Sequence, residues 1–454
     1  MEALDSRSAV DLVARLRARD LNPREVAEHY LRRIESHRDL NIFLWADADR
    51  ILAGMPLDGW EAKPLAGLPL GLKDNIDTAG IPTTAGSVVD HRRVPSEDAA
   101  VWERLRDSGG ATLLGKVHLA EFAFRVHNSE LGRVRNPRNP DRATGGSSSG
   151  SAAAVAAGLA PAALGTDTGG SVRIPAAYCG VVGYKPSHGL IDTAGIVPLS
   201  TTLDNVGVLA GSVADAGLVL EQMTTSPLRL LEPTSLKVRL PSPARLRIGL
   251  LQGYFRARSE LGVDRVIEGA AKALARAGCR VVPITIPEAG RWRSAHRVVM
   301  LHEAWRFHAR RLREGAPYGP VFRSAISAGE QMGGARYLRA LATQQEAIRR
   351  MAEQFGEVDV LLLATCPGVA PPEEEGRTNM HYTRNTTLAA FAGLPAISVP
   401  AGTGRLGLPV GAQLVGAQGC DARLLGAAAL LEALVSPSVP ARPRSRGVAI
   451  RRGS

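Results

Sequence analysis

GTDTGGSVRIP, at residues 165–175, joins the end of an apolar run to two adjacent glycines and a serine. The preceding residues AALGT predict a short β-strand, so the glycines follow directly after a strand end. Two consecutive glycines allow successive backbone N–H groups to converge on one point, as in an anion-binding nest or an oxyanion hole. Ser171 comes next, which places a hydroxyl beside those donors. The pattern indicates a candidate nucleophile.

A serine nucleophile needs a base. The spacing of the histidines singles none of them out, and each is interpreted as a surface or satisfied core residue: His188, His296, His302, His308 and His381. Ser–Lys versions of the catalytic triad exist, and the chain has only six lysines. Lys73 lies in the polar segment LKDNIDTAG, residues 72–80, and is a candidate base. By pattern alone, a surface lysine in a turn is an equally good interpretation.

Two other motifs match chemistry incompletely. GSSSG, residues 146–150, has the spacing of a nucleophile elbow around Ser148, but an elbow needs a strand directly before it and RNPRNPDRAT predicts a loop. GATLLGKV, residues 110–117, resembles a phosphate-binding loop, but Val117 stands where a hydroxyl is required. We therefore interpret the second motif as a turn followed by a strand. His118 and Glu121 form only a one-turn pair, and no metal site is expected.

Composition narrows the class of protein. The net charge is +11, but the arginines that cause it are spread along the chain, except for a basic tail. Aromatic residues make up 4%, which leaves few stacking platforms for single-stranded nucleic acid, so no nucleic-acid partner is expected. The four cysteines include no CxxC pair and indicate reduced thiols in a cytoplasmic protein. The N-terminus lacks the apolar core of a signal peptide, and no run is apolar enough for a membrane span.

The apolar runs predict an α/β fold. Residues 8–55 predict two or three helices, whereas turns are expected over 54–71 and irregular chain over 72–87. LRIGLL, a helix near 261–277 and CRVVPITI form a β-α-β pattern, which favours parallel pairing. Further predicted elements are the helix 97–108, the strand ATLLGKV, the loop 127–148, the helix SGSAAAVAAGL, the strands VDVLLLAT, PAISVP and LPVGAQLVG, and long helices at 296–314 and 335–355. We expect one domain over 1–435, with helices in residues 1–60 packed on it, and a mobile basic tail at 436–454.

Several stretches, in this order and at this spacing, closely resemble the amidase signature family. The resemblance covers essentially residues 5–435. The segments that carry it are KDNIDTAGIPTTAGS (73–87), TGGSSSGSAAAVAAG (144–158), GTDTGGSVRIPAAYCGVVGYKPSHG (165–189), VPLSTTLDNVG (197–207), AAFAGLPAISVPAG (389–402) and GLPVGAQLVG (407–416).

The resemblance implies one α/β/α domain with a large, mixed, twisted central sheet covered by helices on both faces. It also implies a Ser–cisSer–Lys triad that needs no metal or organic cofactor. By position, Ser171 matches the nucleophile, Ser147 the bridging serine behind a cis peptide at Gly146–Ser147, and Lys73 the base. The backbone donors of the oxyanion hole match Thr168, Gly169 and Gly170.

The implied reaction is hydrolysis of a small-molecule amide C–N bond through an acyl-enzyme. The alternative is the glutaminase component of a tRNA-dependent amidotransferase, which has the same triad. SVRIPAAYCG and YTRNTTLAAFAGLP, residues 382–395, depart from the patterns of that component and favour a free-standing hydrolase. Residues 124–138, 300–335 and 376–385 are expected to line the acyl pocket, and Arg125 to face solvent, with pairing to an acidic substrate as the alternative. A homodimer is possible.

Overall fold

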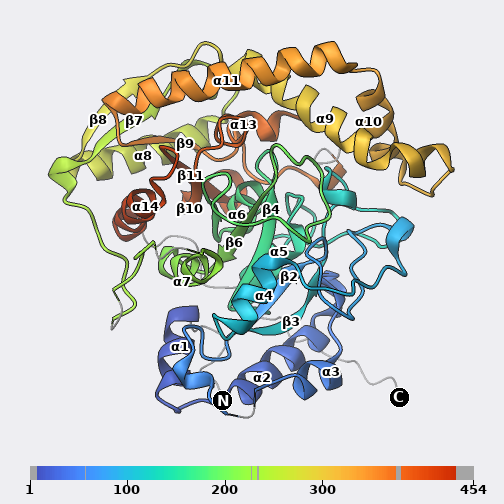
Figure 1. Ribbon diagram of the computed structural model, residues 1–454. Coiled ribbons are helices and arrows are strands. Elements are labelled where there is room, and N and C mark those ends of the chain that lie inside the picture. Colours follow the sequence, from blue (N-terminus) through green and yellow to red (C-terminus); the bar gives the residue numbers. More distant parts are fainter. Residues whose placement is uncertain (1–7, 57, 226–227, 233–234, 375–379, 436–454) are drawn as a thin grey trace, which may run out of the picture.

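One mixed β-sheet runs through the centre of the molecule (Figure 1). The computed structural model describes residues 8–56, 58–225, 228–232, 235–374 and 380–435. The predicted tail 436–454 lies outside this range. Within it the sheet has eleven strands in the order β1-β3-β2-β4-β6-β5-β10-β11-β9-β7-β8. The strands are β1 (Phe43–Trp45), β2 (Pro69–Lys73), β3 (Thr112–Val117), β4 (Ala162–Asp167), β5 (Val182–Lys185), β6 (Asn205–Ala210), β7 (Arg247–Leu251), β8 (Arg280–Ile284), β9 (Val360–Ala364), β10 (Ala396–Thr403) and β11 (Pro409–Gly416).

Strand direction divides the sheet into three parts. β3, β2 and β4 pair in parallel, and so do β9, β7 and β8. The strands between these groups pair antiparallel. The helices are α1 (Ala9–Arg17), α2 (Pro23–Ser36), α3 (Ala48–Ala53), α4 (Ala100–Asp107), α5 (Ser149–Ala156), α6 (Arg173–Cys179), α7 (Val213–Met223), α8 (Leu261–Arg276), α9 (Ala289–Arg313), α10 (Pro320–Glu330), α11 (Gly334–Glu357), α13 (Thr387–Phe391) and α14 (Asp421–Val435). The predicted parallel β-α-β unit is confirmed as β7, α8 and β8.

Helices cover both faces of the sheet, as expected. Side chains alternate between the two faces of a strand. In β9, Val360 and Leu362 pack into one apolar cluster with residues of α8 and α14, whereas Leu361 and Leu363 pack into another with residues of α9 and α11. On this second face, α5 and α6 cover β4 and β6 through a small cluster that includes Ala152, Ala176 and Leu209. The fold is therefore α/β/α.

The N-terminal helices belong to the same core as the sheet. Leu12 and Leu16 of α1 and Val26 of α2 are buried in the cluster that also contains β2 and β4 residues. In Figure 1 these helices, drawn in blue, lie at the end of the molecule opposite to α9, α10 and α11.

Strand β2 corrects the expectation of turns over 54–71 and irregular chain from 72. Its five residues, PLGLK, are all buried, and both neighbours are parallel strands. Pro69 is tolerated because it is the first residue of the strand. At Gly71 a Cβ would lie 3.3 Å from Val117 and 3.5 Å from Ala163, so the glycine suits close packing across the strands. Pairing with β3 and β4 thus outweighs the Pro and Gly signals. α6, α7, α10, α14, β5 and β6 were also not predicted.

Helix α5 fits under the sheet because all eight of its residues are small enough to be buried. At Gly150 a Cβ would lie 2.5 Å from the His118 carbonyl oxygen and 2.6 Å from its nitrogen. Those atoms belong to the backbone and cannot turn away. The glycine therefore sets how close the helix approaches the chain that follows β3.

We predict that Gly150→Ala lowers the unfolding midpoint, although alanine is the better helix former. Gly269→Ala in α8 is the matched control, because Gly269 is exposed and a Cβ there meets nothing within 4 Å. The control should gain about 0.8–1 kcal/mol of stability from helix propensity. Thermal and urea unfolding of both variants measure this. Equal stabilisation by the two substitutions would contradict the packing argument.

Candidate active site

The ends of three strands bring polar side chains together at one edge of the sheet. β2 and β4 are parallel, with Leu72 opposite Leu164, so Lys73 and Asp167 both lie at their carboxyl ends. β6 runs antiparallel to β4, with Asn205 opposite Asp167, so Asp204 reaches the same edge at the start of its strand. This is the edge at which open α/β sheets place their ligands.

Lys73 is fully buried at this edge. Its Nζ lies 2.8 Å from Ser147 Oγ and 2.7 Å from Thr166 Oγ1. Burial lowers the pKa of Lys73 to about 7, although the charges of Asp204 and Asp167 act in the opposite direction. An amine with this pKa is substantially neutral near pH 7, which is what a general base requires.

Ser147 and the loop before it are tied to the 165–171 segment. The Gly146–Ser147 peptide bond is cis. Ser148 Oγ donates to the Thr166 carbonyl (3.1 Å), and the Ser148 amide donates to the Ser171 carbonyl (3.1 Å). The third serine, Ser149, begins α5 and lies 2.7 Å from His127 Nε2 through its hydroxyl. The three serines therefore have three different surroundings, and Ser147 is the one beside Lys73.

Asp167 and Arg173 hold the turn that carries Ser171. The Asp167 carboxylate accepts hydrogen bonds from the amides of Gly170 (2.7 Å) and Val172 (3.1 Å). Arg173 donates to the same carboxylate from Nε (3.0 Å) and Nη2 (2.9 Å). Burial raises the pKa of Asp167, but the charge and hydrogen bonds of Arg173 outweigh this and bring it to about 2. Both side chains are fully buried, so the pair has a structural role.

The Gly170 amide is one of the three expected oxyanion donors, and here it is bound to Asp167. Thr168 and Gly169 line the cavity next to Ser171, whereas Gly170 is absent from that lining as described. The amides of Gly169 and Ser171 donate no hydrogen bond within the described part of the chain. These two amides are the groups free to meet a ligand in the cavity.

The cavity beside Ser171 has a volume of about 270 Å³. Ser171 is half-buried, and its hydroxyl makes no hydrogen bond among the residues that the structure describes. Ser147 lines the same cavity, so both hydroxyls face one space. Other lining residues come from the loop after β3, from α9 and from the segment before α13: Ala123, Phe124, Arg125, Leu199, Arg293, His296, Arg297, Met300, Tyr382, Thr383 and Thr387.

His296 is a site residue that the sequence interpretation missed. It is buried in α9, and its Nε2 lies 2.8 Å from the Thr168 carbonyl oxygen. A carbonyl only accepts hydrogen bonds, so Nε2 carries the proton. Burial lowers the pKa of His296 to about 4, so the ring is neutral at pH 7. Arg293, His296 and Met300 follow a helical spacing of three and four residues, which was the available signal.

Asp204 supports the turn from below. Its carboxylate accepts hydrogen bonds from the Thr168 hydroxyl and from the amides of Leu199 (2.8 Å) and Ser200 (3.0 Å). Burial raises the pKa of Asp204 to about 6, against these hydrogen bonds and the charge of Lys73. The carboxylate is therefore electrostatically linked to the lysine.

Arg125 lies differently from the expectation of a solvent-facing side chain. It is half-buried and lines the cavity. It also hydrogen-bonds Tyr382, an interaction that lowers the pKa of that phenol against the effect of burial. Of the segments expected to line the pocket, Phe124, Met300 and Tyr382 do so, whereas 375–379 lie outside the described residues.

The remaining candidate motifs have structural roles. Lys116 of the phosphate-loop-like motif is buried in β3, 3.2 Å from Asp74 and 2.6 Å from Thr83 Oγ1. Glu121 accepts hydrogen bonds from Ser87 and Asn128. Over the described ranges no cluster of three His, Cys, Asp or Glu side chains could hold a metal ion, and no helix is long and apolar enough to cross a membrane.

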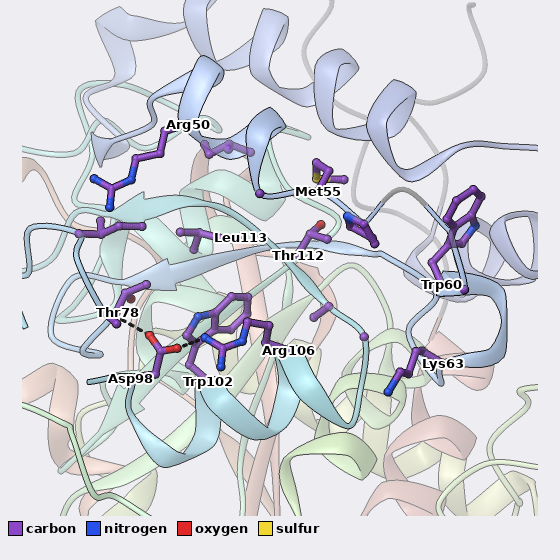
Figure 2. Close-up of a pocket in the computed structure, with 18 of the residues that line it drawn as sticks. Arg50, Met55, Trp60, Lys63, Thr78, Asp98, Trp102, Arg106, Thr112 and Leu113 are labelled. Carbon is purple, nitrogen blue, oxygen red and sulfur yellow. Dashed lines mark hydrogen bonds and ion pairs between the residues drawn. The ribbon is translucent and has the colours of Figure 1, made fainter. Parts of the chain in front are cut away.

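A second cavity, of about 440 Å³, lies between the N-terminal region and α4 (Figure 2). Asp98 there accepts from the Ala79 amide (2.6 Å) and pairs with Arg106. Arg50 donates to the Gly80 carbonyl (2.7 Å), and Lys63 donates to the Asp107 carbonyl (2.9 Å). Its charged groups thus satisfy one another, and the reactive serines lie in the cavity at the strand ends instead.

The geometry therefore defines a serine-dependent acyl-transfer site on an α/β/α fold. The sequence profile of the Amidase family matches residues 25–425. The chain is 35% identical to the glutaminase component of glutamyl-tRNA(Gln) amidotransferase (its "A" polypeptide) from Ralstonia nicotianae, over 91% of this chain and 94% of that protein. This chain belongs to the amidase family.

Solved structures agree with this assignment. The peptide amidase of Stenotrophomonas maltophilia is similar, with a TM-score of 0.78, 31% identity, and coverage of 95% of this chain and 97% of that chain. A chain from an inhibitor-bound complex, described as revealing the evolutionary origins of an s-triazine catabolic enzyme, has a TM-score of 0.85 and 30% identity. The match covers 95% of this chain and all of that one.

We predict that kcat/KM for amide hydrolysis rises with pH through about 7, as Lys73 loses its proton. Asp204→Asn should move this midpoint to lower pH, because the Asp204 charge raises the pKa of Lys73. Glu303→Gln is the control, since it removes another buried carboxylate that does not act on Lys73. The pH profiles of kcat/KM for the three proteins test this. A midpoint unchanged in Asp204→Asn, or moved equally by Glu303→Gln, would contradict it.

We predict that His296→Leu lowers kcat about tenfold to a hundredfold with a smaller change in KM, because the Thr168 carbonyl loses its donor and the turn shifts. His296→Gln should recover part of kcat, since its amide can donate to the same oxygen. Steady-state kinetics and thermal unfolding separate this effect from loss of folding. No difference between the Leu and Gln variants would exclude the positioning role.

Proposed function

We propose that this protein hydrolyses a carboxylic amide through an acyl-enzyme on Ser171, with Ser147 and Lys73 as a proton relay. The observation that carries the proposal is the position of Lys73, buried with a pKa of about 7 and 2.8 Å from the Ser147 hydroxyl. Ser147 and Ser171 line one cavity, which supports a chain of proton transfer between them.

In the first half-reaction Ser171 Oγ attacks the amide carbonyl carbon. Its proton passes to Ser147, whose own proton passes to Lys73. The C–N bond then breaks, and the relay returns a proton to the departing ammonia or amine. In the second half-reaction water attacks the ester carbonyl, gives its proton to the same relay and releases the carboxylic acid. Every proton taken up by Lys73 is thus returned, and no cofactor is consumed.

The negative charge on the tetrahedral oxygen needs preorganised donors. The proposed hole comprises the 168–171 turn, for which Thr168, Gly169 and Gly170 are the predicted residues. The Asp167 hydrogen bond to Gly170 favours the amides of Gly169 and Ser171 as the working donors in this arrangement. His296 and Asp204, which bind Thr168 from two sides, are the proposed positioning residues for the turn.

A second candidate function is the glutaminase half of a tRNA-dependent amidotransferase. The names of the curated relatives support this candidate better than a free-standing hydrolase, at 35% identity over nearly the whole chain. The chemistry at Ser171 would be the same, with glutamine as the amide and ammonia passed to a partner protein. The departures at 171–180 and 382–395 favour the hydrolase. A cytoplasmic location and a homodimer stay predictions.

We predict that the purified chain alone hydrolyses simple amides, and that Ser171→Ala and Ser147→Ala each lower kcat by about 10³-fold or more. Ser149→Ala is the matched control, since it removes a hydroxyl from the same loop that does not contact Lys73. Ammonia release and mass spectrometry of the acyl-enzyme measure this. Full activity of Ser171→Ala would overturn the proposal. Activity on glutamine only when the partner proteins of an amidotransferase are added would favour the second candidate.

A further inference from the structure

The charge of the catalytic cavity is one-sided. Arg125, Arg293 and Arg297 all line it. Among its described lining residues there is no aspartate or glutamate. A concave site with low-dielectric walls focuses the field of such charges and raises the local concentration of anions.

Two of these arginines converge on one hydroxyl. Arg125 extends from the loop after β3 and Arg293 from the second turn of α9. Both lower the pKa of Tyr382, Arg125 through its charge and a hydrogen bond and Arg293 through its charge, while burial raises it. The two guanidinium groups therefore reach the same end of the cavity from different elements.

Further positive charge surrounds Arg293. The guanidinium of Arg384 lies 3.5 Å from the centre of the Tyr254 ring and donates to the Tyr254 carbonyl. Burial lowers the pKa of Arg384, and the charges of Arg293 and Arg258 lower it further. The cationic character thus continues beyond the cavity lining.

We propose that the amide substrate carries a carboxylate, and that Arg125 and Arg293 bind it while the amide lies at Ser171. This rests on the proposed function and names the substrate class of the same site. A guanidinium presents planar, paired donors that match a carboxylate, and it stays charged at every working pH. The carboxylate takes the position between the two arginines, beside the Tyr382 hydroxyl.

The same charges disfavour a zwitterion. Glutamine has a carboxylate and an ammonium on one carbon, so binding the carboxylate brings the ammonium close to the arginines. No acidic side chain of the described lining is present to pair with that ammonium. The substrate is therefore a monoanionic amide, which also separates the two candidate functions.

Arg125 additionally marks the limit of the cavity. Arg125, Gly146, Ile174 and Tyr382 line both the catalytic cavity and a neighbouring cavity of about 460 Å³. Arg125 and Tyr382 therefore stand where the two spaces meet. A carboxylate bound there is held at the far end of a small acyl chain.

The experiment compares three amides of one chain length: glutaramate, which has a carboxylate, pentanamide, which is neutral, and glutamine, which is a zwitterion. We expect kcat/KM to be at least about tenfold higher for glutaramate than for either of the others. The advantage over pentanamide should shrink as ionic strength rises, because salt screens charge attraction.

Variants locate the recognition. Arg125→Gln and Arg293→Gln should each lower the glutaramate-to-pentanamide ratio by about tenfold, and Arg125→Lys should recover only part of it because lysine lacks the paired donors. Arg310→Gln is the matched control, since it removes an exposed charge from the same helix as Arg293 and should keep the ratio. Binding of glutaramate to Ser171→Ala, by calorimetry, reports recognition without turnover.

The outcomes are distinct. Equal rates for pentanamide and glutaramate, or a ratio insensitive to Arg125 and Arg293, overturn the carboxylate while amide hydrolysis stands. Glutamine exceeding glutaramate overturns the monoanion in favour of the amidotransferase component. Failure of every amide to react, with no acyl-enzyme formed, overturns the proposed function itself.

Discussion

The buried ion pair between Asp167 and Arg173 is the constraint on which the site depends. It joins the end of β4 to the first turn of α6, and Arg173 also donates to the Thr386 carbonyl (2.9 Å) and to Gln413 Oε1 (2.6 Å). The turn that carries Ser171 is thus fastened to β11 and to the segment before α13. Breaking such a pair by removing one partner costs about 3–5 kcal/mol, because the other charge stays buried. The glycine turn is held by this network and not by its own backbone preferences.

The second physical element is desolvation of one amine. Lys73 loses water because β2 lies between β3 and β4, and the nearby carboxylates of Asp167 and Asp204 only partly compensate. Asp167 is itself bound to Arg173, and Asp204 is engaged by Thr168 and two backbone amides. The same carboxylates that hold the turn therefore leave the lysine able to lose its proton near pH 7. Structure and reactivity at this edge of the sheet share one set of hydrogen bonds.

Sequence reasoning located Ser171, the serine loop and Lys73 but left the surroundings open. A glycine pair after an apolar run is a local signal, and so is a lysine in a polar segment. His296 and Arg293 lie more than a hundred residues away on a long arginine-rich helix, where nothing local separates cavity-facing positions from exposed ones. Arg125 was expected in solvent and lies in the cavity wall instead, because its neighbours Tyr382 and Ile174 come from distant segments. β2 was missed for the same reason, since only its partners make PLGLK a strand.

The amino-acid sequence by itself determined the α/β class, the parallel β7-α8-β8 unit, the family and the residues expected to react. These depend on periodicity, glycine spacing and short motifs, which are properties of neighbouring residues. Only the tertiary structure decided that Lys73 is buried and close to Ser147, that the Gly170 amide binds Asp167, and that three arginines line the cavity of the reacting serine. Burial, charge and distance arise from segments far apart in the chain, so they exist only once the sheet has brought the strand ends together.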